Sequence, residues 1–294
     1  MFGGTYSGRR VFVTGHTGFK RSWLASWLVD LGADVTGYAL APPTAPSLFD
    51  ALGLDQRLSH VQADVRDQGR LVAEMAAARP SVVFHLAAQP LVRLGYAEPR
   101  ETFETNVMGT VNVLEAARVC ESAAAVVIVT SDKCYDNPED GRPFREADAM
   151  GGRDPYSASK GCAELVAAAY RASFFGSDPS VSVATVRAGN VIGGGDWAPD
   201  RILPDCVRAL TAGGPVLVRS PDAVRPWQHV LEPLSGYLQL GARMTGRDGR
   251  GYEGAWNFGP DAADGARQVR WVVERFLEEW GAGSWTTPDD LGAQ

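Results

Sequence analysis

Residues 10–21 read RVFVTGHTGFKR, and this stretch holds a strand, a glycine turn and the start of a helix. The β-branched and aromatic run Arg10–Val13 is too short for a stable helix and predicts a strand. Gly15 and Gly18 follow it, and apolar residues at helical spacing over 24–31 predict the helix. Glycines let a backbone approach a phosphate closely, and a helix N-terminus favours an anion. Both glycines could be turn residues alone, but their place at the first strand–helix junction favours a dinucleotide site.

Short apolar runs recur along the chain after this first unit, with longer periodic stretches between them. The runs that predict further strands are 34–38, 81–85, 125–130 and 182–187. Helical spacing returns over 107–117 and 161–171. Alternating strands and helices build parallel sheets, so we expect an α/β fold, a Rossmann-type doubly wound parallel sheet. A smaller, mixed C-terminal lobe is expected because the sequence becomes rich in glycine, proline and tryptophan after about residue 193.

The composition is that of a globular protein, because 45% of the 294 residues are hydrophobic and 21% are charged. The 28 basic and 35 acidic residues give a net charge of −7, so nucleic acids and anionic membranes are not expected partners. An anionic ligand must then be held by a few well-placed cations. The four cysteines show no CxxC spacing, which favours a reduced, cytoplasmic protein without a metal site. The sequence shows neither a signal peptide nor a run of the ~18 apolar residues that cross a membrane.

Two features depart from the usual dinucleotide fingerprint. Its third glycine falls at Arg21, whose side chain either crowds the cofactor diphosphate or swings outward and pairs with it. The sequence leaves the sign of this effect open, and the crowding hypothesis predicts tighter NAD binding in Arg21→Gly. The segment Tyr38–Ala41 carries neither the acidic residue expected for NAD nor an arginine for the 2′-phosphate of NADP. Asp64 either contacts the adenine or is a solvated loop residue.

A group of polar residues follows the predicted strand at 125–130. The carboxyl ends of parallel strands are where open α/β sheets build their sites. Ser131, Asp132 and Lys133 offer there a hydroxyl, a carboxyl and an amine in succession, which can supply a hydrogen bond, a proton donor and a base. An exposed polar turn would have the same composition.

A tyrosine and a lysine at 156 and 160 add to this group. Their spacing of four places Tyr156 and Lys160 on one face of a helix. A nearby cation stabilises a phenolate, so the pair suits a general base. The spacing alone is common on helix surfaces, and it is the polar loop elsewhere in the chain that favours catalysis.

Several longer motifs carry a resemblance to a known family. They are GHTGFK at 15–20, PSLF at 46–49, HLAAQPLVR at 85–93, ETNVMGTVN at 104–112, TSDKCYDN at 130–137, MGGRDPYSASKGCAEL at 150–165, RAGNVIGGGDW at 187–197 and RPWQHVLEPLSGYL at 225–238. In this order they resemble the extended short-chain dehydrogenase/reductases, and the sugar-nucleotide dehydratases among them. Lysine rather than glutamate after Asp132 separates the chain from dehydratases of dTDP-glucose and makes it similar to those of CDP-glucose.

The resemblance implies an NAD-dependent lyase that converts CDP-D-glucose to CDP-4-dehydro-6-deoxy-D-glucose and water. Tyr156, helped by Lys160, would take the proton of the 4-hydroxyl while hydride passes from C4 to NAD, and Ser131 would polarise the C4 oxygen. Lys133 would then take the C5 proton and Asp132 would protonate the departing 6-hydroxyl, before hydride returns to C6. Lys133 must be neutral for part of the time to act so; alternatively it pairs with Asp132 and orders the loop.

The resemblance also implies binding residues. Those for the cofactor are Gly15, Thr17, Gly18, Phe19, Lys20, Asp64, Val65, Leu86, Ala87, Ala88, Tyr156 and Lys160. Those for the CDP-sugar are Arg93, Asn190, Arg201, Arg219, Arg225 and Asn257, although any one arginine is more often a surface residue. We expect an NAD-binding domain with the catalytic centre over 1–188 and a substrate lobe over 189–294, separate from the first domain or interleaved with it. Helices near 107 and 161 are expected to form a homodimer through a helix bundle, as in related enzymes.

Two other interpretations stay open. A related epimerase or reductase would not need Asp132 and Lys133, so elimination of water distinguishes it from a dehydratase. The second is a non-catalytic protein that binds NAD or a nucleotide sugar, which Arg21 favours. The end of the chain at WTTPDDLGAQ favours it too, because family members usually continue with elements that complete the substrate lobe. The substrate part is therefore expected to be short, and the cofactor half and catalytic centre whole.

Overall fold

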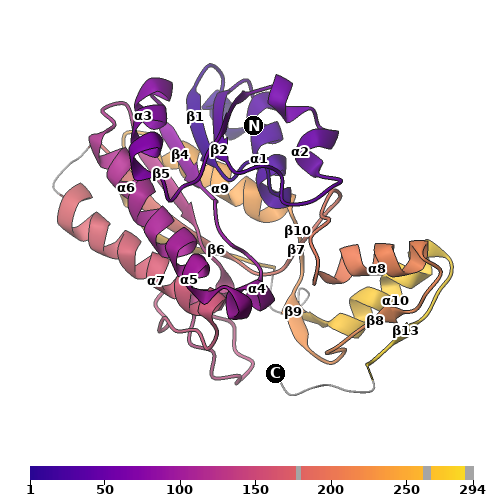
Figure 1. Cartoon of the computed structure of the whole chain (residues 1–294). Coiled ribbons are helices and arrows are strands. Elements are labelled where there is room, and N and C mark those ends of the chain that lie inside the picture. Colours follow the sequence, from indigo (N-terminus) through magenta and orange to yellow (C-terminus); the bar gives the residue numbers. More distant parts are fainter. Residues whose placement is uncertain (177–179, 261–265, 289–294) are drawn as a thin grey trace.

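The computed structural model describes residues 1–176, 180–260 and 266–288. Within them, seven parallel strands form one twisted sheet in the order β11-β6-β5-β4-β1-β2-β3 (Figure 1). These strands are β1 (Arg10–Thr14), β2 (Asp34–Ala39), β3 (Ser59–Gln62), β4 (Val82–His85), β5 (Ala125–Val129), β6 (Ser182–Ala188) and β11 (Gly254–Phe258). Strand order reverses between β1 and β4, which is the doubly wound arrangement. The predicted fold class is confirmed.

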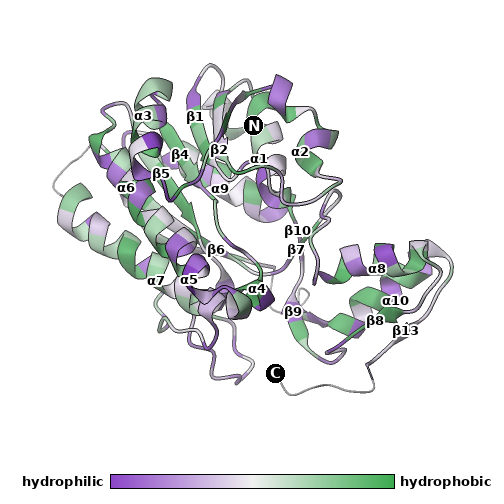
Figure 2. Ribbon diagram, in the orientation of Figure 1, coloured by the Kyte–Doolittle hydropathy of each residue, from purple (hydrophilic) through white to green (hydrophobic). Residues whose placement is uncertain are grey.

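Helices cover both faces of this sheet. One face packs against α1 (Phe19–Asp30) and α9 (Leu231–Met244), and the other against α3 (Gln68–Ala78), α6 (Gly109–Val119) and α7 (Pro155–Tyr170). Figure 2 shows the apolar strands enclosed between these helix layers. Every residue of β5, whose sequence is AVVIV, is buried. A strand covered on both faces needs a continuous apolar run, which is why the central strands were predictable from sequence.

Strands β3 and β11 were not predicted, and both lie at the edges of the sheet. The sequence SHVQ of β3 is only partly buried, and so is GAWNF in β11. An edge strand is covered less completely, so it lacks the apolar signal of a central one.

The helix predicted over 161–171 begins earlier, at Pro155. Pro155 occupies the first turn of α7, and the side chain of Asp154 accepts a hydrogen bond from the backbone N–H of Ser157 at 3.0 Å. An aspartate cap followed by proline is a strong helix start. Tyr156 and Lys160 therefore lie in the first two turns of α7, at the carboxyl edge of the sheet.

The C-terminal part of the chain contributes to two bodies of the fold. Helix α9 and strand β11 pack on the main sheet, whereas α8 (Ile202–Thr211), α10 (Val269–Trp280), β8 (Val216–Leu217) and β13 (Trp285–Thr286) form a smaller unit (Figure 1). Its own core holds Cys206, Val216, Val218 and Val273. The remaining elements are short: α2 (Leu48–Ala51), α4 (Val92–Ala97), α5 (Pro99–Phe103), β7 (Val191–Ile192), β9 (Val224–Pro226), β10 (Gln228–His229) and β12 (Ala266–Gln268). Among the described residues no helix combines the length and apolarity needed to cross a bilayer.

A buried ion pair fastens α7 to the sheet. Arg187 of β6 and Glu164 of α7 are each 5% exposed, and their side chains meet at 2.8 Å and 2.9 Å. Glu164 also accepts hydrogen bonds from Thr130 at 2.5 Å and Thr185 at 2.7 Å. Arg187 donates to the hydroxyl of Tyr135 at 2.6 Å. The network thus joins β6, α7 and both ends of the loop that follows β5.

Breaking one half of this pair should be costly. Glu164→Leu should lower the free energy of unfolding by about 3–5 kcal/mol, because it leaves Arg187 buried without a counter-charge. The double variant Glu164→Leu/Arg187→Met should be clearly less destabilised than Glu164→Leu alone. Urea unfolding measures both. The exposed pair Arg275–Glu278 is the matched control, with an expected loss below about 1 kcal/mol for Glu278→Leu. A Glu164→Leu loss as small as the control's would contradict the structural role given to this network.

Candidate active site

A cavity of about 540 Å³ opens at the carboxyl edge of the sheet. Its wall comes from the start of α1, the loops after β4, β5 and β6, the first turns of α7, and the N-terminal part of α8. The volume lies in the range of ligand sites, and the place is where doubly wound sheets bind their ligands.

The glycine turn forms one side of this cavity. Gly15 has a positive φ of 78°, and a Cβ there would lie 2.8 Å from the Cα of Ala87. Helix α1 begins directly after Gly18 and has no side-chain cap, so its first N–H groups remain available to an anion. Thr14 ties the turn to the loop after β4, since its hydroxyl accepts hydrogen bonds from the N–H groups of Leu86 and Ala87. The backbone of the glycine turn therefore fits the diphosphate of a dinucleotide. The side chain of Arg21 lies across this turn.

The residues predicted to be catalytic lie together in the cavity wall. They are Ser131, Asp132, Lys133, Tyr156 and Lys160. The Ser131 hydroxyl donates to a carboxylate oxygen of Asp132 at 2.9 Å and accepts from the N–H of Lys133 at 3.2 Å. The ammonium of Lys160 donates to the carbonyl of Val129 at 3.3 Å, which anchors α7 to the end of β5.

Burial changes the acidity of two of these groups. It raises the pKa of the Asp132 carboxyl, against a hydrogen bond from Ser131 and the charge of Lys133. A raised pKa makes the protonated acid more accessible, which suits a proton donor. Burial also raises the pKa of Tyr156, and a hydrogen bond with Ser131 and the charges of Arg201 and Arg21 oppose this. A cation or ligand that favours the phenolate would have to complete the activation.

All three lysines of the chain line this cavity, and the other basic residues in the cavity wall are arginines. Burial and the charges of Lys160 and Arg21 lower the pKa of Lys20 to about 7. Burial and Arg21 likewise lower the pKa of Lys160 to about 7. Lys20 donates to the hydroxyl of Tyr237 at 2.8 Å, a contact that sequence reasoning missed because the two residues are 217 positions apart. An arginine cannot lose its proton in this range, so only lysine can serve as both cation and base.

Most of the predicted binding residues also reach the cavity. On the cofactor side these are Thr17, Gly18, Phe19, Lys20, Leu86 and Ala88, and on the substrate side Arg93, Asn190, Arg201, Arg219 and Arg225. Arg93 and Arg219 both contact Asp200, at 3.5 Å and 2.7 Å, and Arg201 pairs with Asp196 at 3.1 Å. These arginines are held in place by carboxylates and still face the cavity.

Five predicted binding residues lie outside the cavity wall: Gly15, Asp64, Val65, Ala87 and Asn257. Both carboxylate oxygens of Asp64 are engaged by Arg66, at 2.6 Å to 2.9 Å. Asn257 accepts from the hydroxyl of Tyr135 at 2.7 Å and donates to the carbonyl of Phe144 at 3.2 Å. Asn257 thus belongs to the network around Arg187, a role that its position at the end of a strand did not reveal.

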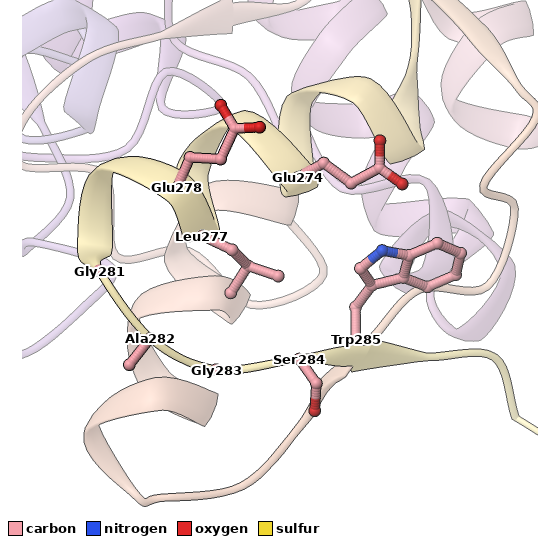
Figure 3. A pocket seen from close by; sticks show the side chains of 8 residues that line it. All are labelled: Glu274, Leu277, Glu278, Gly281, Ala282, Gly283, Ser284 and Trp285. Atoms are coloured by element: carbon pink, nitrogen blue, oxygen red, sulfur yellow. The ribbon is translucent and has the colours of Figure 1, made fainter.

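A second hollow lies at the far end of the smaller unit, between α10 and β13 (Figure 3). Glu274 and Glu278 of α10 and Trp285 of β13 line it. The hollow has carboxylates and no basic side chain in its wall, so it does not suit a phosphate-bearing ligand.

The fold and the site together define a class of protein. A doubly wound sheet with a glycine turn before α1, and a buried tyrosine–lysine pair at its carboxyl edge, is typical of enzymes that use a dinucleotide cofactor. The sequence model of the NAD dependent epimerase/dehydratase family matches residues 11–253, and the chain belongs to this family.

Individual relatives within this family show which proteins the chain is similar to. The chain is 52% identical over 280 residues to the CDP-glucose 4,6-dehydratase of Salmonella typhimurium, covering 94% of this chain and 77% of that one. DesIV, a dTDP-glucose 4,6-dehydratase from Streptomyces venezuelae solved with NAD and TYD bound, is 27% identical with a TM-score of 0.79, covering 95% of this chain and 84% of that chain. MoeE5 in complex with UDP-glucose and NAD is 27% identical with a TM-score of 0.76, covering 94% and 85%.

The lysine cluster predicts how stability depends on pH. Lys20 has a pKa of about 7 in the folded protein and an ordinary value near 10.5 when unfolded, so the unfolded chain binds more protons between these values. The free energy of unfolding of the ligand-free protein should therefore rise from pH 7 to pH 9, by up to about 1.4 kcal/mol per pH unit for one such lysine. Lys20→Met should flatten this slope in urea titrations, and Arg10→Met, which removes an exposed cation that does not titrate in this range, is the control that should keep it. Equal slopes in the protein and in Lys20→Met would contradict the assignment.

Proposed function

We propose that this protein is a CDP-glucose 4,6-dehydratase, a lyase that converts CDP-D-glucose to CDP-4-dehydro-6-deoxy-D-glucose and water. The observation that carries the proposal is the meeting of Asp132 and Lys133 with Tyr156 and Lys160 in one cavity of an NAD-dependent family fold. An epimerase or reductase needs a base for one hydroxyl proton, whereas a dehydratase also needs a base at C5 and an acid at the 6-hydroxyl. The 52% identity to the CDP-glucose 4,6-dehydratase of Salmonella typhimurium supports the same choice.

NAD is the cofactor. The glycine turn, Thr17, Phe19 and the loop residues Leu86 and Ala88 would hold it, with its diphosphate at the N-terminus of α1. When bound, NAD oxidises the sugar transiently at C4 and is regenerated when the sugar is reduced at C6. The cofactor would lie against the part of the fold built by residues 1–188, and the nucleotide and diphosphate of the substrate mainly against residues from 189 onwards, with the sugar between the two parts.

In the first step Tyr156 takes the proton of the sugar 4-hydroxyl. Lys160, one helical turn further along α7, stabilises the phenolate as a cation, and the proton taken from the 4-hydroxyl stays on the phenol oxygen of Tyr156. Ser131 donates a hydrogen bond to the C4 oxygen, which polarises it as the carbonyl forms. The 4-keto group then acidifies the proton at C5.

In the second step water is eliminated across C5 and C6. Lys133 removes the C5 proton, and Asp132 in its protonated form donates a proton to the departing 6-hydroxyl. The raised pKa of the Asp132 carboxyl supports the acid role. The water formed carries the 6-hydroxyl oxygen. Reduction at C6 would then be matched by a proton that Lys133, after exchange with solvent, returns to C5, so the overall conversion is redox-neutral.

The substrate diphosphate needs cations in a protein whose net charge is −7. Arg201, Arg219 and Arg225 line the cavity from the C-terminal part of the chain, and arginine can bind phosphate oxygens in a bidentate way. Arg93 and Asn190 would line the sugar end. We assign no nucleotide contact to Asn257, because both ends of its side-chain amide are already bound.

The protein is also proposed to be a cytoplasmic homodimer. Large apolar side chains lie exposed along the helices on one side of the sheet: Tyr96 65%, Phe103 37%, Met108 49%, Leu165 61% and Phe174 46%. Tyr96 lies in α4, Phe103 in α5 and Leu165 in α7, while Met108 and Phe174 lie in the turns directly before α6 and directly after α7. A second copy packed against this side of the sheet would remove them from water by a helix bundle. The four unpaired cysteines fit a reducing compartment.

The decisive assay follows CDP-glucose, with NAD supplied, by the alkaline ultraviolet absorbance of the 4-keto product. The unaltered protein should dehydrate CDP-glucose, and Tyr156→Phe should abolish product formation and exchange of the C5 proton with deuterated solvent. Lys133→Met should reduce C5 exchange by about 10²–10⁴-fold, because it removes the base. Asp132→Asn should reduce product formation and leave C5 exchange in place.

Each outcome has a distinct meaning. Lack of dehydration at saturating NAD, both by the unaltered protein and by Arg21→Ala, would refute the proposed function. Formation of a C4 epimer alone would point to the epimerase alternative. C5 exchange at an undiminished rate in Lys133→Met would refute the role of Lys133 while leaving the overall reaction standing.

A further inference from the structure

The side chain of Arg21 lies on the glycine turn itself. A Cβ at Gly18 would meet the Nη1, Cδ and Cζ atoms of Arg21 at 2.8, 3.2 and 3.5 Å, and these are the three nearest heavy atoms. The Cδ of Arg21 is also 3.0 Å from the Cβ position of Gly15. The open face that two glycines leave for a phosphate is therefore filled by the arginine that follows them.

Arg21 is held there by one hydrogen bond and lacks a carboxylate partner among the described residues. Its guanidinium donates to the carbonyl of Ala88 at 3.1 Å, across the mouth of the turn. Burial and the charge of Arg201 lower the pKa of Arg21 to about 10, still high enough to keep it charged. A cation in the first turn of α1 also opposes the positive end of the helix dipole. The guanidinium therefore occupies a place that is electrostatically better suited to an anion.

Two effects of Arg21 on a bound diphosphate oppose each other. Its charge attracts the anion, but the same charge helps to lower the pKa values of Lys20 and Lys160, so both lysines become more fully charged when Arg21 is removed and offset its loss. Its volume excludes the anion, because two groups cannot occupy the same face of the turn. Exclusion is therefore the stronger effect.

We propose that Arg21 is a built-in competitor for the diphosphate of the cofactor, which can bind only after this side chain leaves the glycine turn. Arg21 is thus a residue that sets cofactor affinity in this chain. Only a fraction of the protein molecules has Arg21 turned away from the glycine turn and can bind NAD. The apparent Kd for NAD is raised by the reciprocal of that fraction. The inference rests on the NAD-binding part of the proposed function and not on the dehydration reaction.

The test is calorimetric binding of NAD and of ADP-ribose, which keeps the diphosphate but lacks nicotinamide. Arg21→Ala, which clears the face and keeps a good helix former, should bind both ligands about tenfold more tightly or better. Arg21→Met keeps a long side chain without charge, and its affinity for NAD should lie between those of the unaltered protein and Arg21→Ala. Adenosine, which has no phosphate, should bind all forms equally when its affinity is measured by NMR.

Three results would overturn the proposal. Weaker or unchanged NAD binding in Arg21→Ala would mean that Arg21 clamps the diphosphate or does not affect it. An equal gain in NAD affinity in Arg21→Met and Arg21→Ala would assign the effect to the charge of Arg21 and not to the space that its side chain fills on the glycine turn. Equal tightening by Arg10→Ala, the control at an exposed arginine, would assign it to net charge. The proposed function fails separately, if Arg21→Ala saturated with NAD does not dehydrate CDP-glucose.

Discussion

The ion pair between Glu164 and Arg187 is the interaction on which the rest of the site depends. Glu164 lies one helical turn after Lys160, and its carboxylate accepts a hydrogen bond from the hydroxyl of Thr130, the residue directly before Ser131. Arg187 holds Tyr135 at the other end of the same loop. One buried network therefore fixes the tyrosine and lysine of α7 relative to the serine, aspartate and lysine of the loop. It adds to the hydrogen bond of Lys160 with the carbonyl of Val129, which joins the same two segments.

The distribution of charge explains how an acidic protein can serve an anionic ligand. The net charge of −7 is spread over the surface, whereas the cavity concentrates three lysines and several arginines. Like charges and burial lower the pKa values of Lys20 and Lys160, which brings both lysines close to neutrality at physiological pH. An entering diphosphate would favour their charged forms again. Ligand binding and proton uptake are thus expected to be coupled in this site.

The parts of the fold that the sequence predicted are those with a strong local signal. Central strands such as β5 are continuous apolar runs, and the glycine turn stands at a fixed place after β1. The five residues predicted to be catalytic could be picked out, and the cavity brings them together, because Ser131–Lys133 follow a central strand and Tyr156 and Lys160 share a helix. Edge strands β3 and β11 escaped prediction because partial burial weakens their pattern.

Contacts between distant segments could not be predicted in this way. Two such contacts are the hydrogen bond from Lys20 to Tyr237 and the one from Tyr135 to Asn257. The ion pair of Asp64 with Arg66 is local, but it too depends on where the side chains point. Arg187 did carry a signal, since a charged residue inside a buried strand needs a partner. Arg21 was recognised as a departure from the fingerprint, but the direction in which its side chain runs needed the structure.

In the reaction that we propose, the sugar is oxidised at C4, loses water and is reduced at C6 in one cavity before the product leaves. CDP-glucose labelled with deuterium at C4 tests this directly when the product is analysed by mass spectrometry and NMR. The deuterium should reappear at C6 of the same molecule, with a solvent-derived proton at C5. Loss of the deuterium to solvent, or its retention at C4, would contradict it.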